Sequence, residues 1–306
     1  MTEEGMTENV NEHTQGHLLG AADIRRIAAD AGISPTKKFG QNFVIDPGTV
    51  RRIVREAGVT ADDHVLEVGP GLGSLTLAIL ETGATMTAVE IDPPVAERLP
   101  KTIAEFMPDA VDRFRVVNRD ALTVNPENLP DFKDDDSFTL VANLPYNVTT
   151  PLITAFLEAG CFESVTVMIQ KEVAQRLCAA PGTGEYGAFS VLVQWYAEPK
   201  LLFDVPPHCF VPQPKVTSAV VRMDRRAAPP ASVDDEKLFF RTVRAAFAQR
   251  RKTLSNALRS GFSELDRAAI ESAMEETGLP PAVRGETLSI AQFAALSNAL
   301  LRKFDK

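Results

Sequence analysis

A glycine-rich turn is the feature of this sequence whose residue types most clearly indicate a ligand site. The apolar run Val65–Val68 ends at Gly69-Pro70-Gly71-Leu72-Gly73, and a helix-like segment begins at Ser74. Glycine is favoured where the backbone takes a positive φ or where a ligand approaches it closely. Open α/β sheets bind ligands at the carboxyl ends of their strands, so we expect a ligand beside Gly69 and Gly71. A purely structural strand–helix connection is the alternative.

An acid just before the turn narrows the class of ligand. The glycines follow a GxGxG pattern, without the GxGxxG spacing that binds the pyrophosphate of a dinucleotide. Glu67 stands two residues before Gly69, where its carboxylate repels a pyrophosphate but attracts an ammonium or sulfonium group. S-adenosylmethionine carries both of these cations. The turn therefore predicts S-adenosylmethionine as the cofactor, and nothing in the sequence indicates a metal.

Two more acids come at the ends of the next two strand-like segments. Glu90 follows the turn by about 20 residues, the spacing at which an acid accepts hydrogen bonds from ribose hydroxyls. Asp120 is placed to accept a hydrogen bond from the amine of an adenine ring. We expect Ile91 and Ala121, the next residues along the chain, to line the same site. Each acid alone reads equally well as an exposed loop residue, whereas acids at three successive strand ends indicate a binding site.

The segment Asn143-Leu144-Pro145-Tyr146 has the groups needed to make an aromatic amine react. The lone pair of the exocyclic amine of adenine is delocalised into the ring, so this nitrogen is a poor nucleophile. The side-chain oxygen of Asn143 and the backbone carbonyl of Leu144 can accept its hydrogens and draw the nitrogen towards tetrahedral geometry. Pro145 shapes the turn without a competing N–H, and Tyr146 can stack on a flipped base for about 1–3 kcal/mol. A proline turn beside a buried tyrosine is the alternative.

These residues lie at strand ends in an alternating pattern of strands and helices. The strand-like runs are apolar nearly throughout, which is typical of strands buried on both faces of a parallel sheet. The alternation predicts a doubly wound α/β domain. We expect strands over His64–Gly69, Thr85–Asp92, Phe114–Asp120, Phe138–Asn143, Ser164–Gln170, Ser190–Tyr196 and Ala219–Asp224, and helices over Leu75–Glu81, Pro93–Phe106, Pro151–Glu158 and Lys171–Cys178.

The later part of the chain predicts an antiparallel last strand and a second domain. Ala219–Asp224 follows Ser190–Tyr196 across several prolines and without an obvious helix. By fold analogy, such a sheet favours a Rossmann-like class I methyltransferase over a dehydrogenase. The composition changes to that of a linker at Ala227–Pro230, and apolar residues then recur at helical spacing. We predict a disordered polar tail over 1–17, an S-adenosylmethionine-binding domain over 18–228 and a small all-α domain over 233–306.

Composition limits the possible locations and partners. The three cysteines, Cys161, Cys178 and Cys209, are far apart, which argues against a disulfide framework or a zinc site and is typical of the reducing cytoplasm. No apolar run reaches the roughly 20 residues needed to cross a membrane, so no membrane partner is predicted. The formal net charge of −9 argues against a nucleic-acid partner unless positive charge is concentrated locally.

Such a concentration occurs between residues 241 and 259, which include six cations and no acid. We read this stretch as a basic helix that binds phosphates, with a merely solvated face as the alternative. Phe210, in a proline-rich segment, is expected to stack on a target base opposite Tyr146; a rigid connector is the equally favoured alternative. RNA contacts are predicted for Lys37, Lys38, Phe210, Arg241, Arg244, Arg250, Arg251 and Lys252.

Several motifs in order along the chain resemble one family. The segment 143–146 is similar to the NLPY motif of adenine-N6 methyltransferases, and Phe39–Phe43 resembles the FGQNF segment that precedes the first strand. Further matches are Gln170–Leu177, Tyr186–Val191, Val205–Phe210, Pro214–Val220 and Phe247–Leu254. Together they resemble the small-subunit ribosomal RNA adenine dimethyltransferase family of the KsgA/RsmA type, from about His17 to the C-terminus.

The resemblance implies an activity and a set of cofactor contacts. It implies two methyl groups on each of two adjacent adenines, in a hairpin loop near the 3′ end of 16S rRNA. Its substrate would be the immature 30S subunit, and the enzyme a cytoplasmic monomer. Val44 stands where the family often has leucine, a mild change for a backbone contact. The family pattern places in the cofactor pocket Asn42, Val44, Gly69, Glu90, Asp120 and Asn143.

Three other functions compete with this interpretation. A relative that methylates adenine in large-subunit rRNA would share the cofactor and NLPY features, although the QRRKTL segment at Gln249–Leu254 and the proline-rich block favour the small-subunit family. The second alternative is a ribosome-assembly factor whose binding matters more than its catalysis. The third is a nicotinamide-dependent oxidoreductase, which NADH binding without S-adenosylmethionine binding would favour.

Overall fold

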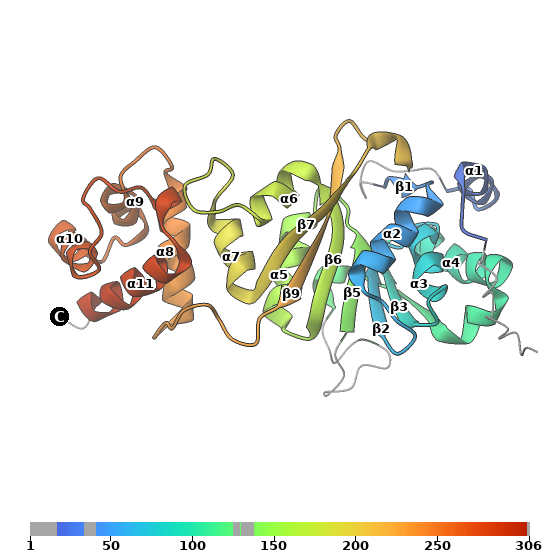
Figure 1. Cartoon of the computed structure of the whole chain (residues 1–306), viewed down its shortest axis with the longest axis horizontal. Coiled ribbons are helices and arrows are strands. Elements are labelled where there is room, and N and C mark those ends of the chain that lie inside the picture. The colour runs from blue at the N-terminus through green and yellow to red at the C-terminus, as the bar shows by residue number, and fades with distance from the viewer. Residues whose placement is uncertain (1–16, 34–40, 125–128, 130–137, 305–306) are drawn as a thin grey trace, which may run out of the picture.

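A seven-stranded sheet forms the centre of the molecule in this computed structural model, which describes residues 17–33, 41–124, 129 and 138–304 (Figure 1). The strand order is β4-β3-β2-β5-β6-β9-β7. The first five strands are parallel, while β9 runs antiparallel to both of its neighbours. The strands are β2 (His64–Val68), β3 (Thr85–Glu90), β4 (Phe114–Asn118), β5 (Phe138–Asn143), β6 (Phe162–Gln170), β7 (Ala197–Val205) and β9 (Ser218–Arg225).

Helices cover both faces of this sheet, which confirms the α/β prediction. Neighbouring residues of one strand point to opposite faces, so Val65 belongs to one hydrophobic core and Leu66 to the other. The Val65 core includes side chains of α1 (Ala21–Asp30), α2 (Pro47–Ala57), α3 (Ser74–Leu80) and α4 (Pro93–Phe106). The Leu66 core includes side chains of α5 (Thr149–Ala159), α6 (Lys171–Leu177) and α7 (Ala188–Tyr196). Short 3-10 helices are η1 (Pro108–Arg113), η2 (Ala121–Thr123), η4 (Pro207–Cys209) and η5 (Gly285–Thr287).

One predicted strand is wrong. Ser190–Tyr196 lies within helix α7, and the strand of this region is β7, which follows it directly. The Gly187 N–H donates to Ser190 Oγ at 3.0 Å at the start of the helix. Val193 packs into the sheet core while Trp195 packs against the C-terminal helices, so α7 has apolar contacts on more than one side. A helix buried in this way lacks the polar face that separates a helical pattern from that of a buried strand.

The antiparallel last strand is confirmed, but it does not lie at the edge of the sheet. β9 inserts between β6 and β7, with Val221 opposite Val167 of β6 and Leu201 of β7. The proline-rich connection that precedes β9 includes a short strand, β8 (Phe210–Val211). β8 pairs antiparallel with β1 (Phe43–Val44), outside the main sheet. This small ribbon joins two segments that are far apart in the sequence.

The region after the predicted linker is helical, as expected. It contains α8 (Glu236–Ala248), α9 (Leu254–Gly261), α10 (Arg267–Glu276) and α11 (Ile290–Phe304), drawn in orange and red in Figure 1. Trp195 of α7 stacks on Phe239 of α8 with 4.3 Å between ring centroids. The hydrophobic core is therefore continuous across the linker, and the division into two domains stays a prediction. No helix of the described ranges has the length and apolar character to cross a membrane. The predicted tail, apart from His17, falls outside the described residues.

Candidate active site

A cavity of about 280 Å³ lies at the carboxyl ends of β2, β3, β4 and β5. In a parallel sheet, strand ends from different parts of the sequence meet at one edge, which is why acids at successive strand ends converge. The cavity is lined by all the predicted cofactor and catalytic residues: Asn42, Val44, Glu67, Gly69, Gly71, Glu90, Ile91, Asp120, Ala121, Asn143, Leu144, Pro145 and Tyr146. What each residue binds stays a prediction.

The glycine turn shapes the floor of the cavity. Gly69 and Gly71 have φ values of 67° and 57°, in the left-handed region that side-chain-bearing residues rarely adopt. A Cβ atom added to Gly71 would lie 2.9 Å from Cδ1 of Phe43. Gly71 thus allows the segment before α2 to close over the turn.

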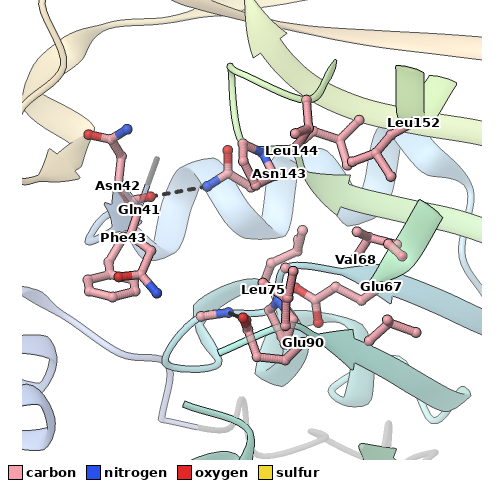
Figure 2. A pocket seen from close by; sticks show the side chains of 18 of the residues that line it. Gln41, Asn42, Phe43, Glu67, Val68, Leu75, Glu90, Asn143, Leu144 and Leu152 are labelled. Atoms are coloured by element: carbon pink, nitrogen blue, oxygen red, sulfur yellow. Dashed lines mark hydrogen bonds between the residues drawn. The ribbon is translucent and has the colours of Figure 1, made fainter. Parts of the chain in front are cut away.

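Two carboxyl groups of the cavity are buried among few polar partners (Figure 2). Glu67 is 1% exposed and accepts a hydrogen bond from Thr76 Oγ1 at 2.6 Å. Burial raises the pKa of Glu67 to about 8. Glu90 is 4% exposed and accepts a hydrogen bond from the Asp92 N–H at 2.9 Å. Burial likewise raises the pKa of Glu90 to about 6. Such a pair favours a cationic ligand, because a nearby positive charge stabilises the carboxylate forms that burial disfavours.

The mouth of the cavity combines polar and apolar groups. Asp120 is exposed and accepts the Leu122 N–H at 3.0 Å, at the start of η2. Ile91 and Leu122 are 45% and 44% exposed, and both line the cavity. Large apolar side chains left in water at a cavity mouth suit a flat aromatic ring. Leu122 is absent from the predicted site, although its position beside Asp120 and Ala121 could have indicated it.

The NLPY turn occupies the far wall of the cavity. Asn143 ends β5, and its Nδ2 donates to the Asn42 carbonyl at 3.2 Å (Figure 2). The Leu144 N–H donates to the Met168 carbonyl at 3.1 Å, and among the described residues nothing donates to the Leu144 carbonyl. Pro145 provides the carbonyl that accepts from the Thr149 hydroxyl at 3.0 Å, at the start of α5. The turn therefore leaves one backbone acceptor and one amide oxygen for a ligand.

Comparison with known proteins identifies the family. Residues 34–301 match the model described as ribosomal RNA adenine dimethylase. The chain belongs to the ribosomal RNA adenine dimethylase family. A Bifidobacterium adolescentis protein named ribosomal RNA small subunit methyltransferase A is 68% identical over 307 residues, covering 96% of this chain and 98% of that protein. A Thermobifida fusca protein of the same name is 50% identical, covering 95% of this chain and 99% of that protein.

Solved structures agree with this membership. The 23S rRNA methyltransferase ErmE has a TM-score of 0.63 and 28% identity, covering 85% of this chain and 99% of that one. A dimethyladenosine transferase from Plasmodium falciparum has a TM-score of 0.66 and 21% identity, covering 83% and 95% of the two chains, and supports the fold. The resemblance predicted from the motifs is thus confirmed, and family membership implies S-adenosylmethionine as methyl donor.

One expectation for this rRNA adenine dimethylase family member does not fit the structure. Phe210 is 2% exposed and packs into the core beside Val44, with which it pairs across the β1–β8 ribbon. Its ring therefore has no free face to stack on a base opposite Tyr146. Burial arises because η4 and β8 fold the proline-rich connection back onto α2 and β1, which the sequence pattern did not reveal.

The predicted basic helix is also divided. Residues 241–259 form the end of α8, a turn and the start of α9. Arg241 donates to the Gly261 carbonyl and pairs with Glu264 at 2.6 Å, so it holds two helices together. Arg250 donates to the carbonyls of Gly184 and Tyr186 at 2.6 and 3.1 Å, which fastens the loop between α6 and α7.

Three other cations of this stretch face solvent. Arg244, Arg251 and Lys252 are exposed, and none of them forms an ion pair within the part of the chain that the structure describes. Lys37 and Lys38 lie outside the described residues.

Proposed function

We propose that this chain transfers methyl groups from S-adenosylmethionine to the N6 amines of two adjacent adenines in the 3′-terminal hairpin loop of 16S rRNA, two to each. Relatives of up to 68% identity over nearly the whole chain are named ribosomal RNA small subunit methyltransferase A, which supports this choice of substrate. We propose the immature 30S subunit as the form recognised, and a cytoplasmic monomer as the acting species.

The observation that carries the proposal is the pair of acceptors at the NLPY turn. The Asn143 side-chain oxygen and the unpaired Leu144 carbonyl line the same cavity as Glu67 and Glu90. A cofactor site and a site for an amine with two hydrogens therefore lie in one cavity. This combination suits transfer of a group to adenine N6.

The cavity residues fit S-adenosylmethionine. Glu67 is buried and suits an ammonium group, and Glu90 can accept hydrogen bonds from ribose hydroxyls. Ile91 and Leu122 offer apolar surface for the adenine ring, with Asp120 beside them for its amine. When bound, the cofactor supplies an electrophilic methyl group on a sulfonium that leaves as a neutral thioether.

The chain itself orients the target amine. In the first transfer the Asn143 oxygen and the Leu144 carbonyl accept the two hydrogens of the amine, and in the second transfer one of them accepts the single hydrogen that remains, so the lone pair is released from the ring and directed into the cavity. Tyr146 provides a ring face for the base. No strong general base is required, because the methylated nitrogen is acidic and its proton passes to water. Positioning therefore supplies most of the rate.

RNA phosphates would be held by the exposed cations of the C-terminal helices. We assign Arg244, Arg251 and Lys252 to this surface. Arg241 and Arg250 act on it indirectly, since both hold neighbouring backbone in place. The acidity of the rest of the chain limits non-specific RNA binding.

The test is transfer of labelled methyl from S-adenosylmethionine to unmethylated small subunits, followed by mapping of the modified nucleosides. We expect dimethyladenosine at two adjacent positions near the 3′ end of the RNA. Label in large-subunit RNA alone would preserve the chemistry and overturn the substrate. An assembly factor would be favoured by two results together. Wild type would bind S-adenosylmethionine but transfer no label, and a Glu90→Ala variant would support normal assembly of small subunits in cells.

A further inference from the structure

The two ends of the Asn143 amide differ chemically, and only one of them can serve an amine. The oxygen accepts hydrogen bonds, whereas the NH₂ group donates them and would repel the hydrogens of N6. In the structure Nδ2 donates to the Asn42 carbonyl at 3.2 Å (Figure 2). Because a carbonyl only accepts, this bond determines which way the amide faces. The Asn42 carbonyl thus directs the Asn143 oxygen away from itself.

Strand β1 holds the Asn42 carbonyl in place on one side. Phe43, the next residue, pairs with Val211 across the β1–β8 ribbon. The Ile45 N–H extends this pairing by donating to the Cys209 carbonyl at 2.9 Å. The position of the Asn42 carbonyl is therefore fixed by the connection that leads into β9.

Ser74 fastens β1 on the other side. It is the first residue of α3, it is 7% exposed, and its Oγ donates to the Val44 carbonyl at 2.6 Å. Phe43 also packs closely against the glycine turn, as the 2.9 Å approach to a Cβ at Gly71 shows. β1 therefore connects the turn that faces the cofactor with the side chain that faces the amine.

We propose that Ser74 is a positioning residue for methyl transfer, which acts through β1 and the Asn42 carbonyl to keep the Asn143 oxygen directed at the target amine. This inference rests on the proposed function. Without the Ser74 hydroxyl, β1 loses its bond to α3 and is held by β8 on one side alone, so the Asn42 carbonyl shifts more readily and holds the Asn143 amide less firmly in the orientation that presents its oxygen.

The first experiment compares Ser74→Ala with wild type in single turnovers at saturating S-adenosylmethionine. We expect the rate of methyl transfer to fall about tenfold, which corresponds to about 1.4 kcal/mol. Cofactor affinity, measured by calorimetry, should change about threefold or less, because Glu67 and Glu90 keep their places when the bond from Ser74 to Val44 is lost, although Ser74 and Val44 line the same cavity. The matched control is Ser255→Ala, a serine of equal 7% exposure near the start of α9, which should keep the wild-type rate. An unchanged rate in Ser74→Ala would overturn the proposal.

A double-mutant cycle tests whether Ser74 acts through Asn143. In the Asn143→Ala background, Ser74→Ala should reduce the rate by about twofold or less, since coupled residues are non-additive. A full tenfold loss in that background would show that Ser74 acts by another route. If wild type transferred no methyl to small subunits, the proposed function would fail, and the next measurement would still decide the inference.

That measurement needs neither cofactor nor RNA. The side-chain NH₂ resonances of Asn143 are assigned by their absence from Asn143→Ala in ¹⁵N-asparagine-labelled protein. In wild type they should show the shift of a hydrogen-bonded amide, and Ser74→Ala should move and broaden them. Ser255→Ala should leave them unchanged. Identical Asn143 signals in Ser74→Ala and wild type would overturn the proposal whatever the activity.

Discussion

Tyr146 and Ser218 share a hydrogen bond of 2.6 Å between their hydroxyl groups, which ties the turn after β5 to the first residue of β9. Ser218 is fully buried, whereas Tyr146 is half-buried and lines the cavity. Burial raises the pKa of Tyr146, so its phenol stays neutral. The ring of Tyr146 is thus anchored at its far end, which leaves its face to the ligand.

Substitutions at Tyr146 and Ser218 should distinguish the contribution of the tyrosine ring from that of its hydroxyl hydrogen bond. Tyr146→Ala removes a stacking face worth about 1–3 kcal/mol, so kcat/KM for the RNA should fall by about 5- to 150-fold. Tyr146→Phe and Ser218→Ala each remove the hydrogen bond but keep the ring, and should cost about tenfold or less. Steady-state kinetics on unmethylated small subunits measures all three variants. Equal losses in Tyr146→Ala and Tyr146→Phe would assign the effect to the hydroxyl and contradict the stacking role.

Asn143→Ala should affect the reaction more than binding of the cofactor. It removes one of the two acceptors for the amine, and we expect kcat to fall by about 100-fold, as when one hydrogen-bonding group of a transition-state site is removed. Cofactor affinity should fall less, because Glu67 and Glu90 remain. Single-turnover rates and calorimetry on the same preparation give the two numbers. Activity equal to that of wild type would exclude the assigned role.

The buried acids predict a pH dependence of cofactor binding. Glu67 and Glu90 have pKa values raised by burial to about 8 and about 6, and a cationic ligand binds their carboxylate forms better. Affinity for S-adenosylmethionine should therefore rise as pH increases from 5.5 to about 7.5, and fall above about 8, where the amino group of the ligand loses its own proton. For one linked proton the slope is at most about tenfold per pH unit. Glu67→Gln should flatten the upper part of a calorimetric profile, and a full slope in that variant would contradict the assignment.

The raised pKa values give the stability of the cofactor-free protein a pH dependence opposite to that of cofactor affinity. A carboxyl whose pKa is raised on folding holds its proton more tightly in the folded state. The free energy of unfolding should therefore decline as pH rises from about 4.5, the ordinary glutamate value, to the folded value of about 8 for Glu67. Urea titrations at several pH values should show a smaller decline for Glu67→Gln than for wild type.

The parts of the site that the sequence predicted are those fixed by local pattern and sheet topology. Glu67, Glu90 and Asp120 end successive strands, and parallel pairing alone brings such ends to one edge. Glycine spacing and the NLPY chemistry required no tertiary information either. The residues predicted for the cofactor and for the amine could thus be expected to line one cavity, as they do.

The parts that failed depend on contacts between distant segments. Phe210 is buried because β8 pairs with Val44 of β1, a pairing that no local pattern specifies. Arg250 donates to the carbonyl of Gly184, a contact that the sequence did not indicate, and its role in RNA binding stays a prediction. Ser190–Tyr196 is wrongly predicted as a strand because this helical segment packs both into the sheet core and against α8, and burial on several sides removes the periodicity that separates a helix from a strand.

Trp195 tests whether the helical region folds with the catalytic one. It is 1% exposed and stacks on Phe239, and its indole N–H has no hydrogen-bond partner among the described residues. Trp195→Ala should reduce the free energy of unfolding by about 3–5 kcal/mol, as for a large buried aromatic side chain. Trp195→Phe keeps the ring contact and removes an unpaired donor, so it should cost less. Urea unfolding monitored by circular dichroism measures both.

The shape of that transition decides the domain prediction. Wild type should unfold in one step because its core is continuous, whereas Trp195→Ala should show two steps if the C-terminal helices fold independently. Val111→Ala, at a side chain 44% exposed, is the surface control and should change stability by about 0.5 kcal/mol or less. A single step in Trp195→Ala would mean that the linker at 227–230 does not separate two folding units.

Charge reversal should distinguish the cations that bind RNA from those that hold the protein together. Arg251→Glu combined with Lys252→Glu should weaken binding of the rRNA and make the dependence of log K on log salt shallower by about one unit per lost phosphate contact. The melting temperature should stay at the wild-type value, because both side chains are exposed and form no ion pair with another described residue.

Arg250→Ala should instead lower the stability, since it removes two hydrogen bonds to the loop between α6 and α7. Lys237→Glu, at the other end of α8, is the control for the single reversals Arg251→Glu and Lys252→Glu, because each of these substitutions replaces one cation by one anion. Equal loss of RNA affinity in Lys237→Glu would indicate a general charge effect, and unchanged binding of the double variant across a salt series would remove this turn from the interface.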